Sequence, residues 1–317
     1  MARFDVFNGD ADGICSLVQL RRADPAPEAV LVTGRKRRID LLGDVKAGAG
    51  DFVTVLDVSM RSNMADLKRV LEAGAIVFYA DHHNAGDRPV HDNLFSVIDT
   101  SPKMCTAMLI DDCLGGAYRA WAVTAAFGDN FPALARAKAK EIDLPLERLE
   151  RLGILINYNG YGASEADLHF HPKDLYNHLK DFDTPMAFLH ARPDIYEKLS
   201  EGYAHDMASA QAGEVIDETD FGLVLKLPNA ASSRRVSGVY GNKLAQDYPR
   251  RAHAILTDKD DGYVVSIRAP LSNRLGADIL AMKFETGGGR AAAAGINHLG
   301  RSDLERFVRE FRLAYKR

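Results

Sequence analysis

The sequence predicts an α/β protein with a parallel sheet in its N-terminal part, and two observations lead to this prediction. Over the first hundred residues, short runs rich in β-branched residues alternate with longer segments of helical character, which is the pattern of βαβ units. Several of the short runs are almost wholly apolar, as expected of strands that helices cover on both faces. We therefore predict an N-terminal parallel-sheet domain with helices on both faces.

The expected elements of this domain follow in chain order. The apolar runs predict strands at Arg3–Phe7, Ala29–Thr33, Phe52–Asp57, Ala75–Ala80 and Phe95–Ile98. The segments between them predict helices at Ile14–Arg22, Asp40–Lys46 and Asn63–Ala73. From residue 101 to residue 213 the pattern becomes mainly helical and is punctuated by prolines, with helices expected at Met104–Cys113, Tyr118–Ala126, Ala133–Glu141 and Leu146–Ile156.

A second segment with strand and helix signals begins near Phe221. It contains expected strands at Gly222–Lys226, Ala252–Thr257 and Tyr263–Arg268. The final helix is predicted from a capping box of Ser302 and Glu305, and from an apolar stripe of Leu304, Phe307, Val308 and Phe311. The length of 317 residues suggests two domains at roughly 100–200 residues each. We place them at 1–190 and 216–317, joined by a connecting helix or linker over 191–215.

Composition and charge argue against several classes of protein. The net charge of −4 and the pI near 6.2 argue against a protein that coats long nucleic acid through bulk positive charge. Cys15, Cys105 and Cys113 form neither a CxxC pair nor an even framework, which favours a reducing, cytoplasmic location. No apolar stretch approaches the ~18 residues of a membrane span, so we expect no membrane partner. The N-terminus lacks the apolar core of a signal peptide.

Acidic and histidine residues follow three of the expected strands. Asp10 and Asp12 come just after the first strand, Asp57 ends the third, and the tripeptide Asp81-His82-His83 follows the fourth. The carboxyl ends of parallel strands share one edge of a sheet, and ligands bind in the crevice outside that edge. Four carboxylates gathered there repel one another unless cations compensate them.

Each motif alone has a simpler explanation. A DxD turn is commonly only a turn or a helix cap, Asp57 alone could be a strand-end carboxylate, and DHH alone could be a surface loop. Their joint occurrence at three strand ends predicts a metal site instead. Mixed Asp and His ligands suit Mn²⁺ or Mg²⁺, while Zn²⁺ and Fe²⁺ are harder to exclude. Because a carboxylate can bridge two ions, a two-metal site is plausible.

The chain resembles the DHH phosphoesterase superfamily, which includes RecJ-type exonucleases, nanoRNases and cyclic-dinucleotide phosphodiesterases. Asp10-Ala11-Asp12-Gly13 matches the first motif, Asp57 the second and Asp81-His82-His83 the third. For the fourth motif, Gly128-Asp129 matches better than Asp111 or Asp112, which lie inside an expected helix. The resemblance implies a smaller C-terminal α/β domain that faces the metal site across a cleft. In that domain, Ser266 and Arg268 resemble a substrate-facing strand, and Thr286–Gly295 resembles a glycine-rich turn. The resemblance implies substrate binding by Ser266, Arg268, Gly287, Gly288, Gly289 and Arg290.

The resemblance also implies a chemistry. Two divalent cations are expected, with Mn²⁺ preferred and Mg²⁺ as the alternative. Asp57 would bridge them, Asp10 would serve one ion, and the other would be held by Asp12, His82 and Asp129. A hydroxide between the metals would attack phosphorus, with Asp57, Asp81 and His83 as the catalytic group. His83 would contact the scissile phosphate, or else it only orients His82.

The chain departs from its relatives at several positions. Val6 stands where many relatives have a histidine, Asn8 where RecJ-type members often have an aspartate, and Arg290 where most have a histidine. One metal site is then short of a ligand, binds its ion weakly, or recruits Asn8 or water.

The basic run 34–38, which includes Arg37, either reaches phosphates near the crevice or forms a solvated turn. The segment INYNGYG, with Asn157 and Tyr161, resembles an asparagine-glycine segment of RecJ-like relatives.

The expected function is a metal-dependent phosphoesterase that hydrolyses phosphodiester bonds of short oligonucleotides or dinucleotides. Three alternatives stay open: a RecJ-like single-strand exonuclease, a phosphatase of nucleotides such as a 3′,5′-bisphosphate, and an inactive protein that only binds nucleotides. The expected partner is a short nucleic acid or a nucleotide. A homodimer is compatible with the sequence.

Overall fold

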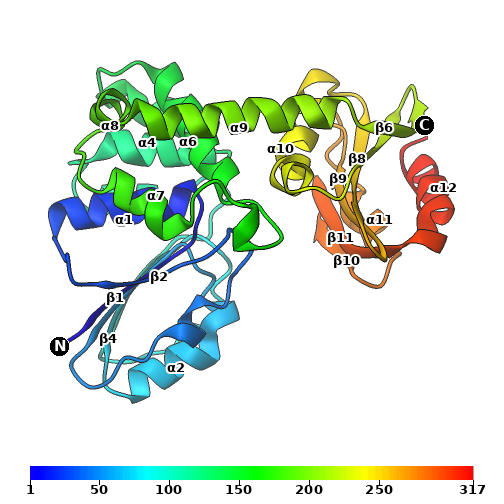
Figure 1. Ribbon diagram of the computed structural model, residues 1–317. Helices are drawn as coiled ribbons and strands as arrows, with labels where there is room; N and C mark the ends of the chain where they lie inside the picture. Colours follow the sequence, from blue (N-terminus) through cyan, green and yellow to red (C-terminus); the bar gives the residue numbers. More distant parts are fainter. Residues whose placement is uncertain (317) are drawn as a thin grey trace. The chain divides into compact units, whose positions relative to one another are not determined.

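The computed structural model describes residues 1–316, and the chain divides between Glu201 and Gly202 into two compact units. The long helix α9 (Pro193–Gln211) runs through this division, so the connection between the units is continuous helix (Figure 1). Within residues 1–316, every helix is too short or too polar to cross a lipid bilayer.

The first unit is built on a five-stranded sheet in which all strands are parallel, as predicted. The strand order is β2-β1-β3-β4-β5. Phe7 pairs with Leu56 and Leu56 with Ala80, so the carboxyl ends of β1, β3 and β4 lie side by side. The chain leaves β1 for β2 on one side and returns for β3 on the other, which is a topological switch point. The strands are β1 (Arg3–Phe7), β2 (Val30–Val32), β3 (Phe52–Leu56), β4 (Ile76–Asp81) and β5 (Leu94–Ile98).

Helices cover both faces of this sheet, which confirms the predicted fold class (Figure 1). On one face, α2 (Met64–Glu72) buries Leu67 and Val70 against Val6 and Val55. On the other face, α1 (Ala11–Ala23) contacts β1 and β3, and α3 (Thr106–Cys113) contacts β4. The remaining helices of the unit are α4 (Arg119–Gly128), α5 (Pro132–Lys138), α6 (Leu146–Asn159), α7 (Pro172–Leu179) and α8 (Pro185–Ala191).

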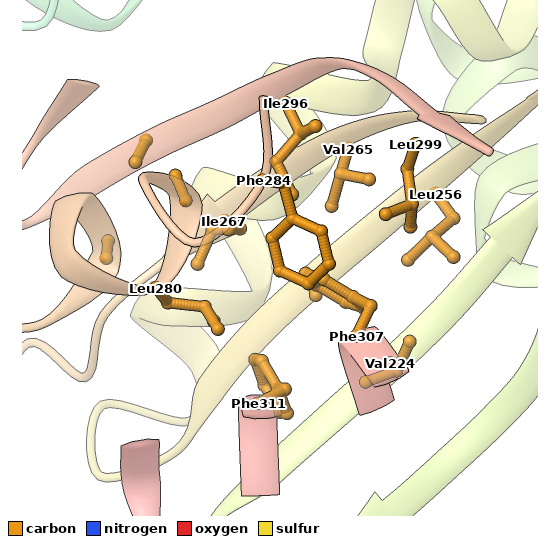
Figure 2. Close-up of a cluster of buried hydrophobic side chains, with 14 of the residues drawn as sticks. Val224, Leu256, Val265, Ile267, Leu280, Phe284, Ile296, Leu299, Phe307 and Phe311 are labelled. Carbon is orange, nitrogen blue, oxygen red and sulfur yellow. The ribbon is translucent and has the colours of Figure 1, made fainter. Parts of the chain in front are cut away.

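The second unit is a six-stranded mixed sheet in the order β10-β11-β9-β8-β7-β6. Only β7 and β8 pair in parallel among its described strands, and α10 (Ala231–Asp247) connects them. The helices α11 (Ala277–Ala281) and α12 (Leu304–Tyr315) enclose an apolar core that includes Phe284, Phe307 and Phe311 (Figure 2). The strands are β6 (Glu214–Thr219), β7 (Gly222–Leu227), β8 (Ala252–Lys259), β9 (Gly262–Arg268), β10 (Gly287–Arg290) and β11 (Ala293–Gly300).

Two local predictions are wrong. The segment 40–46 forms only a short 3₁₀ turn, η1 (Leu41–Asp44), because it contains Gly43 and the side chain of Asp40 makes no capping hydrogen bond. The capping box of Ser302 and Glu305 does not form either. A 3₁₀ turn, η5 (Arg301–Asp303), occupies that position, and α12 starts after Asp303 without a side-chain cap.

The stretch 286–295, which resembles a glycine-rich turn, forms a β-hairpin in which the glycine run itself is a strand. Gly287, Gly288, Gly289 and Arg290 form β10, which pairs antiparallel with β11 at the edge of the second sheet. The turn falls after Arg290, since Arg290 pairs with Ala293. Gly289 has a φ of 144°, a conformation that other residues rarely adopt, and glycine therefore allows an irregular strand here.

A buried histidine in the second unit makes stability depend on pH. His253 on β8 is 1% exposed, and both of its ring nitrogens lack a hydrogen-bond partner within residues 1–316. Burial, followed by the charge of Arg251, lowers the pKa of His253 from 6.5 to about 4. Between these two values the unfolded chain binds a proton that the folded chain does not, so stability falls as the pH falls through this window.

We predict that His253→Leu removes this dependence. In the wild type, the imidazole should cost about 2 kcal/mol of stability between pH 7 and pH 5. Urea unfolding of the two proteins at both pH values measures the difference, with H298Q at an exposed histidine of β11 as the control. An equal loss of stability in wild type and H253L would contradict the prediction.

Candidate metal centre

The carboxyl edge of the first sheet carries a cluster of buried acidic side chains. Asp10 caps the N-terminus of α1, directly after β1, and Asp12 lies in the first turn of that helix. Asp57 follows β3, and Asp81 ends β4. All four of these aspartates are at most 1% exposed. The parallel topology thus brings together the residues that the strand-end pattern predicted.

His82 faces this cluster in a fixed orientation. Its Nδ1 lies 2.9 Å from the carbonyl oxygen of Met104, to which it must donate because a carbonyl only accepts. Its Nε2 lies 3.8 Å from Asp12 Oδ2, 3.5 Å from Asp57 Oδ1 and 3.6 Å from Asp129 Oδ2. A backbone partner on one imidazole nitrogen and acidic groups around the other is the usual setting of a metal-binding histidine.

Asp12 is held by the start of α3. Its Oδ2 accepts from the backbone N–H of Thr106 and its Oδ1 from that of Ala107, both at 2.7 Å. These amides belong to the first turn of the helix, where N–H groups are left without intrahelical partners. Burial is the main reason that the pKa of Asp12 is raised, and the charge of His82 opposes it only in part.

Asp57 has an unusual backbone. Its φ is 58°, in the left-handed region that Asp and Asn tolerate better than other residues with a side chain. Its Oδ1 accepts from the hydroxyl of Thr106 at 3.1 Å. Burial, followed by the negative charges of Asp12 and Asp10, raises the pKa of Asp57 well above its ordinary range. A strained backbone and a strongly perturbed carboxyl group are both typical of functional sites.

Asp81 and His83 form a second pair in the cluster. The Nδ1 of His83 donates to Asp81 Oδ1 at 2.7 Å, while Asp81 Oδ2 is buried without a hydrogen-bond partner among residues 1–316. Burial lowers the pKa of His83, but the hydrogen bond and charge of Asp81 outweigh it and raise the pKa overall. The His83 side chain is 44% exposed, so its ring reaches from the buried cluster to solvent.

The structure distinguishes between the candidates for the fourth motif. Asp129 follows α4 and lies with Asp12 and His82. Asp111 instead pairs with Arg119 at 2.9 Å, and Asp112 pairs with Lys138 at 3.1 Å. Neither belongs to a group of possible metal ligands among the described residues.

The donor set fits a divalent cation. Two overlapping groups have their ligand atoms within 4.8 Å of one another: Asp57, His82 and His83, and Asp12, His82 and Asp129. Carboxylate and imidazole donors of this kind suit Mn²⁺, Mg²⁺ and Zn²⁺. The second group contains the three residues that were expected to hold one ion. Asp10 belongs to neither group, although it was expected to be a ligand.

The structure shows what Asp10 contacts instead. Its Oδ1 accepts from the backbone N–H groups of Asp12 and Gly13, at 3.0 and 3.1 Å. Its Oδ2 lies 2.7 Å from the ammonium of Lys36. Burial raises the pKa of Asp10, but the charge of Lys36 outweighs it and holds the pKa below its ordinary value.

The basic run 34–38 therefore reaches the cluster through Lys36, whereas the predicted residue was Arg37. Arg37 is exposed, and its side chain makes no hydrogen bond or ion pair within residues 1–316. The sequence indicates the basic run but not which of its residues turns inward, because five consecutive loop positions show no periodicity. Thr106, which contacts both Asp12 and Asp57, was also missed.

The residues predicted to bind substrate in the second unit have varied surroundings. Ser266 and Arg268 lie on one face of β9, where Arg268 donates to the Ser266 hydroxyl at 3.0 Å and to Asn242 on α10 at 2.6 Å. Gly288 and Arg290 are exposed on the edge strand β10. A Cβ at Gly288 would meet no atom within 4 Å, while one at Gly287 would lie 1.8 Å from the carbonyl oxygen of Ala281. A side chain at position 288 would thus meet open space, whereas Gly287 is required for packing.

The fold resembles those of several solved structures. One is a DHH-domain protein described as a member of a family of ribosomal proteins, with 16% identity, 98% of this chain and 85% of that chain covered, and a TM-score of 0.66. Another is the exonuclease RecJ bound to manganese, with 16% identity, 98% and 89% covered, and a TM-score of 0.63. A third is a pGpG-specific phosphodiesterase from Vibrio cholerae, with 18% identity, 99% and 100% covered, and a TM-score of 0.55.

These similarities show that the chain has the fold of the DHH-domain proteins over almost its whole length. No protein-family model and no curated protein matches its sequence. The resemblance inferred from four short motifs is therefore confirmed at the level of the fold.

We predict that the backbone at Asp57 distinguishes two substitutions that remove the same charge. Asn tolerates a φ of 58° and Ala does not, so D57A should be less stable than D57N by about 1 kcal/mol. Urea unfolding of both variants in the presence of a metal chelator measures this difference. If D57A equals or exceeds D57N in stability, the left-handed conformation is not a constraint on this position.

Proposed function

We propose that this chain, which has the fold of the DHH phosphoesterases, is a metal-dependent phosphoesterase. The observation that carries the proposal is the orientation of His82, whose Nδ1 is tied to the Met104 carbonyl while its Nε2 faces Asp12, Asp57 and Asp129. A cation that binds Nε2 and lies among the three carboxylates relieves the repulsion between them. When bound there, a divalent cation polarises a phosphoryl oxygen and lowers the pKa of a coordinated water.

The other residues of the centre have separable tasks in this proposal. Met104 and the amides of α3 hold His82 and Asp12 in position, so the ligands are oriented before any ion binds. His83 donates from Nδ1 to Asp81, which leaves its Nε2 for the phosphate of a substrate or for a proton on the leaving oxygen. The 44% exposure of His83 supports this task, because a ring that only oriented His82 would not need solvent access.

The proposed substrates are phosphodiesters of short oligonucleotides or dinucleotides. The net charge of −4 gives no bulk attraction for long nucleic acid. The pGpG-specific phosphodiesterase is a neighbour whose whole chain is matched by almost the whole of this one. A single-strand exonuclease is the second candidate, supported by the fold similarity to RecJ. Mn²⁺ is the proposed cofactor because one RecJ neighbour contains it, and Mg²⁺ is the alternative because another does.

A hydrolysis assay with Mn²⁺ tests this function. The panel should contain bis-p-nitrophenyl phosphate, pGpG, short RNA and DNA, long single-stranded DNA, a 3′,5′-bisphosphate and pyrophosphate. We expect the highest kcat/KM on the dinucleotide and short oligonucleotides. Activity confined to long single strands would favour the exonuclease, and no activity on any member would reject the enzyme proposal.

We predict that D129N lowers kcat at least about 100-fold, because loss of a metal ligand removes several kcal/mol of transition-state stabilisation. D112N is the matched control, since Asp112 is an exposed aspartate paired with Lys138 and lies outside the centre. It should leave the rate within about twofold of wild type. Equal rates for the two variants would remove Asp129 from the proposed site.

We also predict that R290A raises KM about tenfold with kcat little changed, because a charged hydrogen bond to a phosphate contributes uniformly to binding. R250A, at another exposed arginine of the second unit, is the control for loss of charge. Steady-state kinetics on a dinucleotide measure both effects. An unchanged KM in R290A would show that β10 does not bind the substrate through this side chain.

A further inference from the structure

The loop after β2 is tightly fixed against the metal centre. The backbone N–H of Lys36 donates to the carbonyl oxygen of Gly160 at 2.8 Å. Gly9 packs so closely on this loop that a Cβ there would lie 1.9 Å from the carbonyl oxygen of Gly34. These contacts hold the loop in place, so that Lys36 lies beside Asp10, a residue 26 positions earlier in the chain.

The ammonium of Lys36 is fully engaged by oxygen atoms. Its Nζ lies 2.7 Å from Asp10 Oδ2, 2.9 Å from Asp129 Oδ1 and 2.9 Å from Asn157 Oδ1. An ammonium has three N–H donors, so each oxygen receives one. The ring of Tyr161 adds a cation–π contact at 5.4 Å from its centroid. The asparagine-glycine segment 156–162 thus supplies two of the groups that surround this lysine.

Two carboxylates favour the charged form of a lysine that lies beside them. The Lys36 side chain is only 20% exposed, and its ammonium lies between the carboxylates of Asp10 and Asp129. It occupies a position with three oxygen neighbours, two of them carboxylates, which is an environment that a divalent cation would also favour.

Asp129 separates this position from the rest of the centre. Its Oδ1 accepts from Lys36, and its Oδ2 points towards His82 Nε2. Four groups, Asp12, Asp57, His82 and Asp129, therefore remain on the His82 side. On the Lys36 side, both oxygens of Asp10 are already hydrogen-bonded. Val6 on β1 is fully buried in the apolar cluster under α2 and offers no ligand atom.

We propose that the Lys36 ammonium takes the place of a second metal ion, so that the centre binds a single divalent cation among Asp12, Asp57, His82 and Asp129. The proposal rests on the metal binding in the proposed function and changes its expected count from two ions to one. The lysine supplies one positive charge in a fixed place, and the metal supplies the exchangeable charge.

The metal count tests the proposal. Equilibrium dialysis against Mn²⁺, with metal measured by mass spectrometry, should give one ion per chain for wild type. The electron paramagnetic resonance spectrum of the bound Mn²⁺ should be that of an isolated ion. In K36A, removal of the ammonium frees oxygens of Asp10, Asp129 and Asn157, so a second ion should bind, and the spectrum should show coupling between two ions.

Matched variants test whether the exclusion of a second ion depends on a positive charge at position 36. K36R keeps the cation and should still bind one ion. K68A removes an exposed lysine from α2 of the same unit and should also bind one. K36M, which keeps the apolar stem, repeats the K36A test if the alanine variant does not fold, and where neither folds the wild-type count decides.

Two Mn²⁺ ions in wild type would overturn the proposal, because Lys36 would then have to leave its place. One ion in both wild type and K36A or K36M would also overturn it, since the lysine would not be what excludes the second ion. No binding at all would reject both this inference and the metal-dependent function. One bound ion without hydrolysis of any phosphodiester would reject the proposed function and leave the inference standing.

Discussion

The structure of the first unit is governed by the crowding of carboxylates in a place with little water. Asp10, Asp12, Asp57 and Asp81 are at most 1% exposed, and they converge because three parallel strands end at one edge of the sheet. Two unit charges 4 Å apart repel by about 4 kcal/mol at the effective dielectric constant of a protein near its surface. The pKa of Asp57 is raised for this reason, after burial itself. Such a cluster persists only where positive charge and hydrogen-bond donors are placed against it.

The rest of the unit supplies those groups from distant parts of the chain. The start of α3 gives two amides to Asp12, the hydroxyl of Thr106 reaches Asp57, and the single positive charge of Lys36 lies between Asp10 and Asp129. These groups leave negative charge uncompensated in front of His82 Nε2, because no described side chain donates a hydrogen bond into that space. The proposed cation would bind there, so the ion that supplies the chemistry would also balance the charge of the cluster. The strained backbone of Asp57 fits the same account, because strain is retained where a side chain has to point in one direction.

Much of this could be predicted from the sequence, and the limits have physical causes. Strand ends are readable because an apolar run stops at a carboxylate, so Asp57 and Asp81-His82-His83 could be placed at one edge before the fold was known. Asp10 was predicted as a metal ligand, yet its partner Lys36 depends on loop packing between Gly9 and Gly34, which has no sequence periodicity. A turn over 286–295 was expected from the resemblance alone, since the permissive glycines give no local signal for the strand Gly287–Arg290. Its pairing with β11 is a tertiary interaction that overrides local preference.

In the proposed centre, one cation completes the acidic cluster while Lys36 holds the other position. Anomalous diffraction from crystals of wild-type protein grown with Mn²⁺, recorded at the manganese absorption edge, tests it most directly. We expect one anomalous peak per chain, in contact with His82 Nε2 and with carboxylate oxygens of Asp12, Asp57 and Asp129. The Lys36 ammonium should still lie between Asp10 and Asp129. A second peak beside Asp10, or no peak at His82, would contradict it.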